Sequence, residues 1–214
     1  MPDERTSGVI LRTRPLTETS LIDHWLTPDL GRVSTVAKGA RRPKSSFRGK
    51  LDLFYEAEFS FQRSRRSELH ALREVGLKST HLAIRVDLPK LEQLSYFVAL
   101  IERTTEVETP LPEFHRLFLD ALQWVEGHPV SVLTVFAFEF RLLDHLGLTP
   151  AVEESTMSDG SKAIARRLPE PAADEMLMRL TLTPVQRAEL NRFLQSHLLM
   201  HLDRLPSSRQ AALV

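Results

Sequence analysis

The spacing of apolar residues changes once along this chain, near Arg85, and this change constrains the fold more than any other feature. Before Arg85, apolar and polar residues alternate, whereas after it apolar residues recur every three or four positions. Alternation gives a β-strand one apolar face, and the longer spacing gives a helix one apolar stripe. The sequence therefore predicts a β-rich part followed by a helical part. Its 214 residues suffice for one large domain or two small ones.

The clearest alternation runs from residue 53 to residue 62. Its apolar members are Leu53, Tyr55, Ala57, Phe59 and Phe61, and mostly polar residues stand between them. Four shorter candidate strands cover residues 7–13, 20–27, 32–38 and 69–77. Turn-forming residues separate the candidates, among them Pro28 and Gly31. Five short strands within about 80 residues predict a small closed barrel, the size of an OB-fold.

The part after residue 85 shows the spacing of amphipathic helices. The first helix is expected to follow Asp87 as its N-cap, and the second covers about 112–125. A third helix after Pro129 is apolar on most sides, which predicts the central helix. The last begins at Thr183, where Pro184 and Gln186 complete a capping pattern, and is expected to reach about residue 205.

These patterns predict an α+β fold with two domains. An OB-fold barrel is expected over residues 1–80 and an all-α helical domain over 81–214. Within the helical domain, a polar stretch at about 151–171 predicts a loop, and residues 174–180 predict a short helix.

Charge is unevenly distributed, although the 28 basic and 28 acidic residues cancel over the whole chain. Residues 1–80 carry 15 Lys and Arg against 10 Asp and Glu, while residues 81–214 carry 13 against 18. A basic first part indicates an anionic partner for that part. The alternative is a protein whose charges segregate without a functional reason.

The most basic stretch joins the third and fourth predicted strands. From Lys38 to Tyr55 it reads KGARRPKSSFRGKLDLFY. Six basic residues fall within 13 positions, namely Lys38, Arg41, Arg42, Lys44, Arg48 and Lys50. Because Lys and Arg neutralise phosphates, the stretch predicts a flexible loop that binds nucleic acid. Five further cations are expected to widen the same surface, namely Arg12, Arg14, Arg63, Arg65 and Arg66.

Two alternatives stay open for this loop. Its charges can serve only to keep the protein in solution, as charged loops often do. Phe47, the aromatic residue inside it, can stack on an unpaired base or pack into the barrel core. The run of like charges favours nucleic acid, whereas the sequence does not decide between the two roles of Phe47.

Four segments are together similar to one known family. They are GVILRTR at 8–14 with TETS at 17–20, LTP at 26–28 with Gly31, GARRPKS at 39–45 with Phe47 and Leu51, and FEFRLL at 138–143 with LGLTP at 146–150. The third segment is the most specific, and residues 192–202 are also similar. On these residues the chain resembles the RecO family of bacterial recombination mediators and DNA-repair proteins, over nearly its whole length.

The resemblance implies an N-terminal OB-fold, a helical C-terminal domain and a function without catalysis. RecO-like proteins bind single- and double-stranded DNA, anneal complementary strands, contact the single-strand-binding protein SSB and, with RecR, help load the recombinase RecA. The DNA-binding surface of the family carries over to Arg12, Arg14, Lys38, Arg41, Arg42, Lys44 and Arg48. A site for the SSB tail is implied in the helical domain, where Arg116 and Arg141 are the candidate cations.

The chain departs from the family pattern in two places. Many RecO-like sequences carry four zinc-binding cysteines just after the central helix. Here that place holds Ala151-Val152-Glu153-Glu154, and the chain has no cysteine, which excludes a tetracysteine zinc site. Ser46 stands where a second basic loop residue is common, so one potential phosphate contact is missing.

Other kinds of site find no support in the sequence. No P-loop, dinucleotide fingerprint or nucleophile elbow is present, so neither an enzyme nor a cofactor is expected. His197 and His201 share a helix face but lack an evident third ligand, so no metal is expected. The lack of cysteine fits a reducing cytoplasm, and the lack of a signal peptide and of a long apolar run predicts a cytoplasmic protein without a membrane partner. The resemblance implies that this cytoplasm is bacterial and that the protein is nucleoid-associated. The alternative function is a non-catalytic adaptor whose basic loop binds an acidic protein partner.

Overall fold

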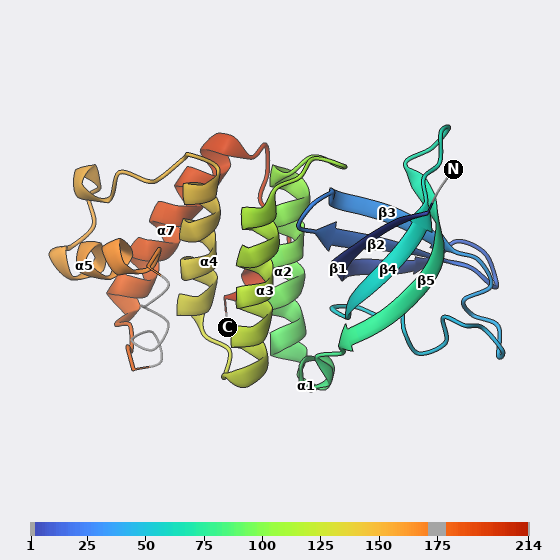
Figure 1. Ribbon diagram of the computed structural model, residues 1–214. Coiled ribbons are helices and arrows are strands. Elements are labelled where there is room, and N and C mark those ends of the chain that lie inside the picture. Colours follow the sequence, from blue (N-terminus) through green and yellow to red (C-terminus); the bar gives the residue numbers. More distant parts are fainter. Residues whose placement is uncertain (1–2, 171–178, 214) are drawn as a thin grey trace. The chain divides into compact units, whose positions relative to one another are not determined.

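The computed structural model describes residues 3–170 and 179–213 (Figure 1). A closed five-stranded barrel comes first and helices follow, which confirms the predicted α+β fold class with an OB-fold barrel before a helical region. The chain divides into two compact units. Unit 1 comprises Met1–Val86 and Thr105–Leu122, and unit 2 comprises Asp87–Thr104 and Gln123–Val214.

Unit 1 contains the barrel. Its strands are β1 (Glu4–Pro15), β2 (Leu21–Thr27), β3 (Gly31–Ala37), β4 (Glu56–Gln62) and β5 (Leu69–Ser79). They pair in the order β1-β2-β3-β5-β4, and β4 closes the barrel by pairing with β1. All neighbours are antiparallel except β3 and β5. The long β1 pairs first with β4 and then with β2, and its register shifts between Ile10 and Arg12.

Aromatic and branched side chains fill the barrel, as the alternation predicts. Trp25 of β2 stacks on Phe59 of β4, with ring centroids 4.1 Å apart. The indole Nε1 of Trp25 donates a hydrogen bond of 2.8 Å to Oγ1 of Thr35. This bond satisfies the one polar atom of a fully buried ring, so the core tolerates a tryptophan at this position.

β4 begins later than the alternation of residues 53–62 suggests. The strand starts at Glu56, because Phe54 has a left-handed backbone with φ of 65°. The Phe54 ring is 1 % exposed and packs near Phe118, which lies in the unit 1 part of α3 (Pro112–Gly127). Periodicity placed Phe54 on the polar face of a strand, whereas a helix far along the chain buries it. Unit 1 also contains the short helix α1 (Leu82–Arg85).

Unit 2 is helical. Its elements are α2 (Leu88–Thr104), the end of α3, α4 (Val132–His145), the 3-10 turn η1 (Val152–Glu154), α5 (Asp159–Arg167), α7 (Pro184–His201) and α8 (Arg209–Ala212). Ten of the 14 residues of α4 are buried, as expected of a central helix. The predicted cap of α7 is present, since Thr183 and Gln186 exchange both capping-box hydrogen bonds. Among the described residues, no helix is long and apolar enough to cross a membrane.

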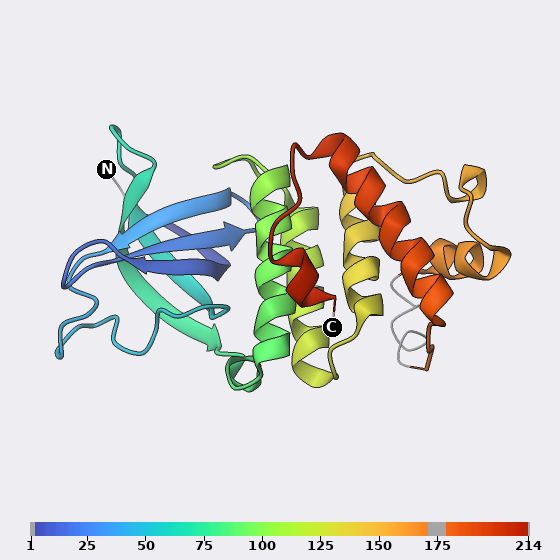
Figure 2. The same ribbon diagram turned by 180° about the vertical axis from the view of Figure 1, so that it is seen from behind.

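A buried polar cluster ties the last helix of unit 2 to its core. The carboxylate of Glu139 in α4 is fully buried and accepts hydrogen bonds from Arg209 at 2.7 and 3.0 Å. The hydroxyl of Tyr96 in α2 donates a third bond of 2.5 Å to the same carboxylate. α8, the short red helix next to the end marked C in Figure 2, is thereby held beside α2.

Two predictions for unit 2 need correction, one of a loop and one of a helix end. The stretch at about 151–171, predicted as a loop, contains η1 and the nine-residue helix α5. α5 buries Ser161, Ile164 and Ala165 and packs beside α7, but its many charges hide this short stripe in the sequence. α7 ends at His201, about four residues earlier than expected. The short helix predicted over 174–180 falls mostly outside the described residues.

Candidate nucleic-acid interface

The basic loop, residues 38–50, leaves the end of β3 as a succession of tight turns. Backbone amides donate to carbonyls three residues earlier, from Arg42 to Gly39 at 3.0 Å, from Ser45 to Arg42 at 3.1 Å and from Arg48 to Ser45 at 3.2 Å. Gly39 and Gly49 have φ of 70° and 71°, values that glycine adopts without strain. The structure therefore shows a hydrogen-bonded loop where the sequence predicts a flexible one.

Side chains and backbone bonds fix the basic loop to the barrel. Ala40 and Phe47 are 8 % and 9 % exposed and belong to the hydrophobic cluster that fills the barrel. The amide of Arg41 donates 2.9 Å to the carbonyl of Thr19, in the turn between β1 and β2. Phe47 thus takes the packing role of its two alternatives. It anchors the loop and is not an exposed stacking platform.

The cations of the loop point outward from these anchors. Those exposed on the loop and on the adjoining end of β1 are Arg14, Lys38, Arg41, Arg42, Lys44 and Arg48. Over residues 3–170 and 179–213, none of these six has an ion-pair partner. Arg48 donates only to the carbonyl of Pro43, at 3.2 Å, and Lys50 is half-buried and donates 3.1 Å to the carbonyl of Val75. Carbonyl partners leave the positive charges unneutralised.

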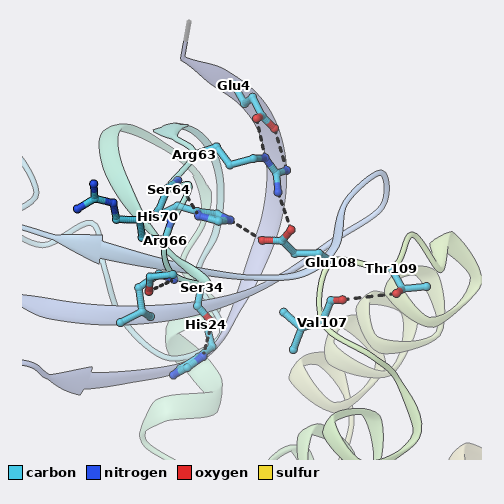
Figure 3. Close-up of polar contacts among 12 residues, drawn as sticks. Glu4, His24, Ser34, Arg63, Ser64, Arg66, His70, Val107, Glu108 and Thr109 are labelled. Atoms are coloured by element: carbon cyan, nitrogen blue, oxygen red, sulfur yellow. Dashed lines mark hydrogen bonds and ion pairs between the residues drawn. The ribbon is translucent and has the colours of Figure 1, made fainter. Parts of the chain in front are cut away.

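Arg12 is also exposed, on the outer face of β1. It lies opposite His24 of β2, which in turn lies opposite Ser34 of β3. The Nδ1 of His24 is 2.9 Å from the Ser34 hydroxyl (Figure 3). The sequence did not identify His24 and Ser34 as neighbours of Arg12, because strand register is set by pairing and cannot be read from one strand.

The arginines of the turn between β4 and β5 form a separate group. Arg63 is engaged in ion pairs with Glu4 of β1, at 2.7 Å, and with Glu108, at 2.6 Å (Figure 3). The hydrogen bond from Arg63 lowers the pKa of Glu4 below its usual value. Arg65 and Arg66 are exposed, and Figure 3 shows Arg66 pointing away from this network.

This second group does not widen the surface of the basic loop. The amide of Glu108 donates 2.9 Å to the carbonyl of Arg32, at the start of β3, whereas the basic loop begins at the other end of that strand. Six residue steps separate Arg32 from Lys38, which corresponds to about 20 Å along a strand. The expectation of one continuous surface is therefore corrected to two clusters on one barrel.

The segment from Thr105 to Thr109 is fixed against the start of β3. A Cβ at Gly31 would come within 2.0 Å of the carbonyl oxygen of Thr109, and Gly31 has φ of 67°. The Nε2 of His70 lies 2.5 Å from Glu108, and the Nδ1 of His70 accepts 3.2 Å from the amide of Ser64 (Figure 3). The turn residue Gly31 thus has a second role, as the point of closest approach for this segment.

Asp23 is a buried carboxylate that the sequence analysis did not single out. It stands opposite Thr13 and Thr35 in the ladders of β1 and β3, near the strand end from which the basic loop departs. The Thr13 hydroxyl donates 2.8 Å to Oδ1, whereas Oδ2 has no partner among the described residues. Burial raises the pKa of Asp23 to about 6. Asp23 stands between Ile22 and His24 in β2, on the face that the strand alternation turns toward the barrel core. This position in the alternation is the sequence signal that could have identified it.

The two arginines considered for the SSB tail lie in different units. Arg116 is exposed on the unit 1 part of α3. Arg141 belongs to unit 2, where its guanidinium donates to the carbonyls of Pro169 at 3.3 Å and Glu170 at 2.9 Å. Arg141 therefore holds the chain that follows α5. Among the described residues, no three His, Cys, Asp or Glu side chains are placed to hold a metal ion.

Comparison with known proteins gives one family for both parts of the chain. The family model for the recombination protein O N terminal region matches residues 1–81, and the model for the recombination protein O C terminal region matches residues 85–158. A protein of Rhodopirellula baltica is 31 % identical over 75 % of this chain and 59 % of its own length. A protein of Idiomarina loihiensis is 36 % identical over 65 % of this chain and 59 % of its own length.

The chain spans about three fifths of the length of the first curated relatives it matches. A relative from Salinibacter ruber is 26 % identical and is matched over 98 % of this chain and 92 % of its own length. All of these relatives carry the name DNA repair protein RecO. Because matches to one family cover both the barrel and the helices that follow it, the chain belongs to the recombination protein O (RecO) family.

Proposed function

We propose that the chain is a DNA-repair protein that binds single- and double-stranded DNA through the basic loop and anneals complementary strands. One observation carries this proposal, namely a set of exposed cations, without carboxylate partners in the described ranges, on a loop anchored to the barrel by Ala40 and Phe47. Such cations can neutralise phosphates and release counterions. Because the loop is already held in place, little order is lost on binding.

The proposed DNA contacts follow the two clusters. The main contacts are Arg12, Arg14, Lys38, Arg41, Arg42, Lys44, Arg48 and Lys50. Arg65 and Arg66 are a second, weaker contact, because they lie in the separate group. Phe47 and Arg63 support the surface and are not phosphate contacts, since one packs in the core and the other is engaged by two carboxylates.

The proposed mechanism is electrostatic. Two complementary strands repel each other through their phosphates, and this repulsion opposes the first base pairs of a duplex. A basic surface raises the local concentration of both strands and lowers the charge cost of bringing them together. The loop therefore needs no nucleophile, metal or cofactor, and we propose that the protein is not an enzyme.

Family membership supports a wider role for the helical part. We propose that residues 1–80 form the DNA-binding domain and that residues 81–214 serve partner proteins, which are RecR, the SSB tail and, indirectly, RecA. The name of the relatives, DNA repair protein RecO, supports the repair role. Arg116 stays a candidate contact for the SSB tail, whereas Arg141 is engaged by backbone carbonyls. Such a protein works at the nucleoid in the bacterial cytoplasm.

The two arginine clusters provide a matched test of the DNA contacts. Arg41→Ala with Arg42→Ala and Arg65→Ala with Arg66→Ala remove the same charge from exposed positions of the same unit. Affinity for a labelled single strand is measured by fluorescence anisotropy across a salt series. Each lost phosphate contact lowers the salt slope by about 0.7, so the first variant loses about 1.4. The second variant loses less.

Equal losses in the two variants would contradict the assignment of the main contacts to the basic loop. An absence of DNA binding by the wild-type protein at moderate salt would contradict the proposed function itself. It would favour the adaptor alternative, in which the basic loop binds an acidic protein.

A further inference from the structure

A groove of about 410 Å³ lies beside the basic loop in unit 1. Ser46, Phe47 and Lys50 of the loop line one side of it. The other side includes Arg5, Ser60 and Glu74, which stand in one row across β1, β4 and β5. Its volume lies within the range of pockets that hold small organic groups. Because residues of the basic loop line one side, the groove adjoins the loop that carries the unpaired cations.

The lining of the groove combines aromatic surface with hydrogen-bonding groups. Phe47 supplies the aromatic part with the 9 % of its surface that stays exposed, whereas the Phe59 ring is stacked on Trp25 in the barrel core. The Ser60 side chain is 4 % exposed, and its hydroxyl forms no hydrogen bond with any residue the structure describes. A nearly buried hydroxyl facing a groove without a partner is available to a ligand.

The acidic residues of the groove are already paired. Glu74 accepts from Arg5 at 2.9 Å, and Glu58 lies 3.1 Å from the amine of Lys78. These ion pairs offset the repulsion that two carboxylates would exert on a nearby phosphate chain. Their oxygens can still accept hydrogen bonds from a neutral ligand, since a carboxylate has about four acceptor positions.

We propose that this groove seats one unpaired nucleobase of a single strand whose phosphates lie along the basic loop, an inference that rests on the proposed function. A base offers a ring face for aromatic contact, amino groups for carboxylates, and carbonyl and ring-nitrogen acceptors for a hydroxyl or an ammonium group. A base inside a duplex must first leave its stack to enter a pocket. The groove thus gives single strands an advantage that the charges alone do not provide.

Gly76 of β5 allows the groove to be closed without a change of charge. It lines the groove, and a Cβ built there meets nothing closer than the carbonyl oxygen of Glu58, at 3.9 Å. Gly76→Ile fills the space with a residue that suits a strand. Gly76→Ala is the matched control, because it also replaces the glycine but adds only one methyl group.

The test compares an oligodeoxycytidine strand, whose base carries an amino group, a carbonyl and a ring-nitrogen acceptor, with an abasic strand of equal length and phosphate number, by fluorescence anisotropy at one salt concentration. The wild-type protein and Gly76→Ala are expected to bind the strand with bases about tenfold more tightly, in line with the lower end of the contribution of one bound base. Gly76→Ile is expected to bind both strands as weakly as the wild-type protein binds the abasic one. Circular dichroism confirms that each variant is folded.

Three outcomes would overturn the inference. A base preference that persists in Gly76→Ile would show that the base lies elsewhere. An equal loss for both strands would show that the substitution disturbs phosphate contacts only. Binding by the wild-type protein without any base preference would refute the nucleobase seat alone, whereas no binding of either strand would refute the proposed function with it.

Discussion

At the scale of single residues, the barrel contains a buried carboxylate that is only partly compensated by hydrogen bonds. Asp23 is fully buried, and only one of its oxygens has a hydrogen-bond partner in the part of the chain that the structure describes. Burying a charged group without full compensation costs free energy, and the group responds by holding its proton more tightly. The pKa of about 6 expresses this cost. The unfolding free energy of the barrel is therefore expected to depend on pH between the ordinary pKa of Asp23, 3.8, and its raised value of about 6.

The sign of this pH dependence follows from the direction of the shift. The pKa of Asp23 is raised from 3.8 to about 6, so the folded barrel binds the proton more tightly than the unfolded chain does. The contribution of Asp23 to stability therefore falls as the pH rises from about 4 to about 6. Asp23→Asn removes this dependence. The gain in unfolding free energy over the wild type is expected to be larger at about pH 7 than at about pH 4, by up to about 3 kcal/mol.

Urea unfolding at a series of pH values measures this difference. The two tryptophans fall in different units, Trp25 in the barrel and Trp124 in unit 2. A Trp124→Phe background therefore lets the fluorescence of Trp25 report on the barrel alone. A difference between Asp23→Asn and its parent that stays constant across the pH series would contradict the buried, uncompensated carboxylate.

The buried pair of Glu139 and Arg209 leads to a second prediction at the residue scale. Arg209→Ala leaves a fully buried carboxylate without its cation and is expected to lower the unfolding free energy of unit 2 by about 3–5 kcal/mol. Arg166→Ala breaks the exposed ion pair with Glu153 and is the control, with no measurable effect expected. Thermal unfolding followed by the helical circular dichroism signal compares the two variants. Similar midpoints would show that the buried pair does not hold α8.

At the scale of elements, the basic loop separates anchoring from the proposed binding of DNA. Ala40 and Phe47 face the core and the cations face solvent, so the two functions use different side chains of one segment. Exposed charges without partners contribute little to stability. Large buried rings contribute much, because their removal leaves a cavity. The stability of the loop and its affinity for DNA are therefore expected to change independently.

Two variants of the loop measure this independence. Phe47→Ala is expected to lower the unfolding free energy of the barrel by about 3 kcal/mol, because it removes a ring from the hydrophobic cluster. The triple change Arg41→Ala, Arg42→Ala and Lys44→Ala is expected to leave the thermal midpoint unchanged and to lower the salt slope for single strands by about 2. A triple variant that no longer unfolds cooperatively would mean that the charges hold the loop.

The sequence predicts the elements better than it predicts their contacts. Alternation and helical spacing identify five strands and the main helices, because each element shows its buried face in its own residues. The burial of Phe54 is not predicted in this way, since it depends on α3, a helix distant from Phe54 in the sequence. α5 escapes it as well, because its apolar stripe is short and surrounded by charges.

For the candidate site too, the sequence predicts the residues better than it predicts their contacts. The cations of the basic loop are evident as a run of residues, but the sequence does not show that Arg63 forms ion pairs with Glu4 and Glu108. Ion pairs between distant segments depend on strand register and chain reversal, which no single segment specifies. The groove beside the loop was missed for the same reason, since its two sides come from the loop and from the row of Arg5, Ser60 and Glu74.

At the scale of the whole molecule, a neutral chain carries a basic surface. The 28 positive and 28 negative residues cancel, so the proposed attraction to DNA cannot come from net charge. It must come from the local arrangement on unit 1, where a fixed loop presents cations without carboxylate partners in the described ranges. The proposed function therefore depends on the fold of the barrel and not on composition.

The central claim is tested most directly by the annealing of two complementary fluorescent oligonucleotides, with and without the protein, across a salt series. The account predicts that the protein accelerates annealing, that the acceleration fades as salt rises, and that the triple variant of Arg41, Arg42 and Lys44 lacks it while remaining folded. Folded protein that fails to accelerate annealing at any salt concentration would contradict it.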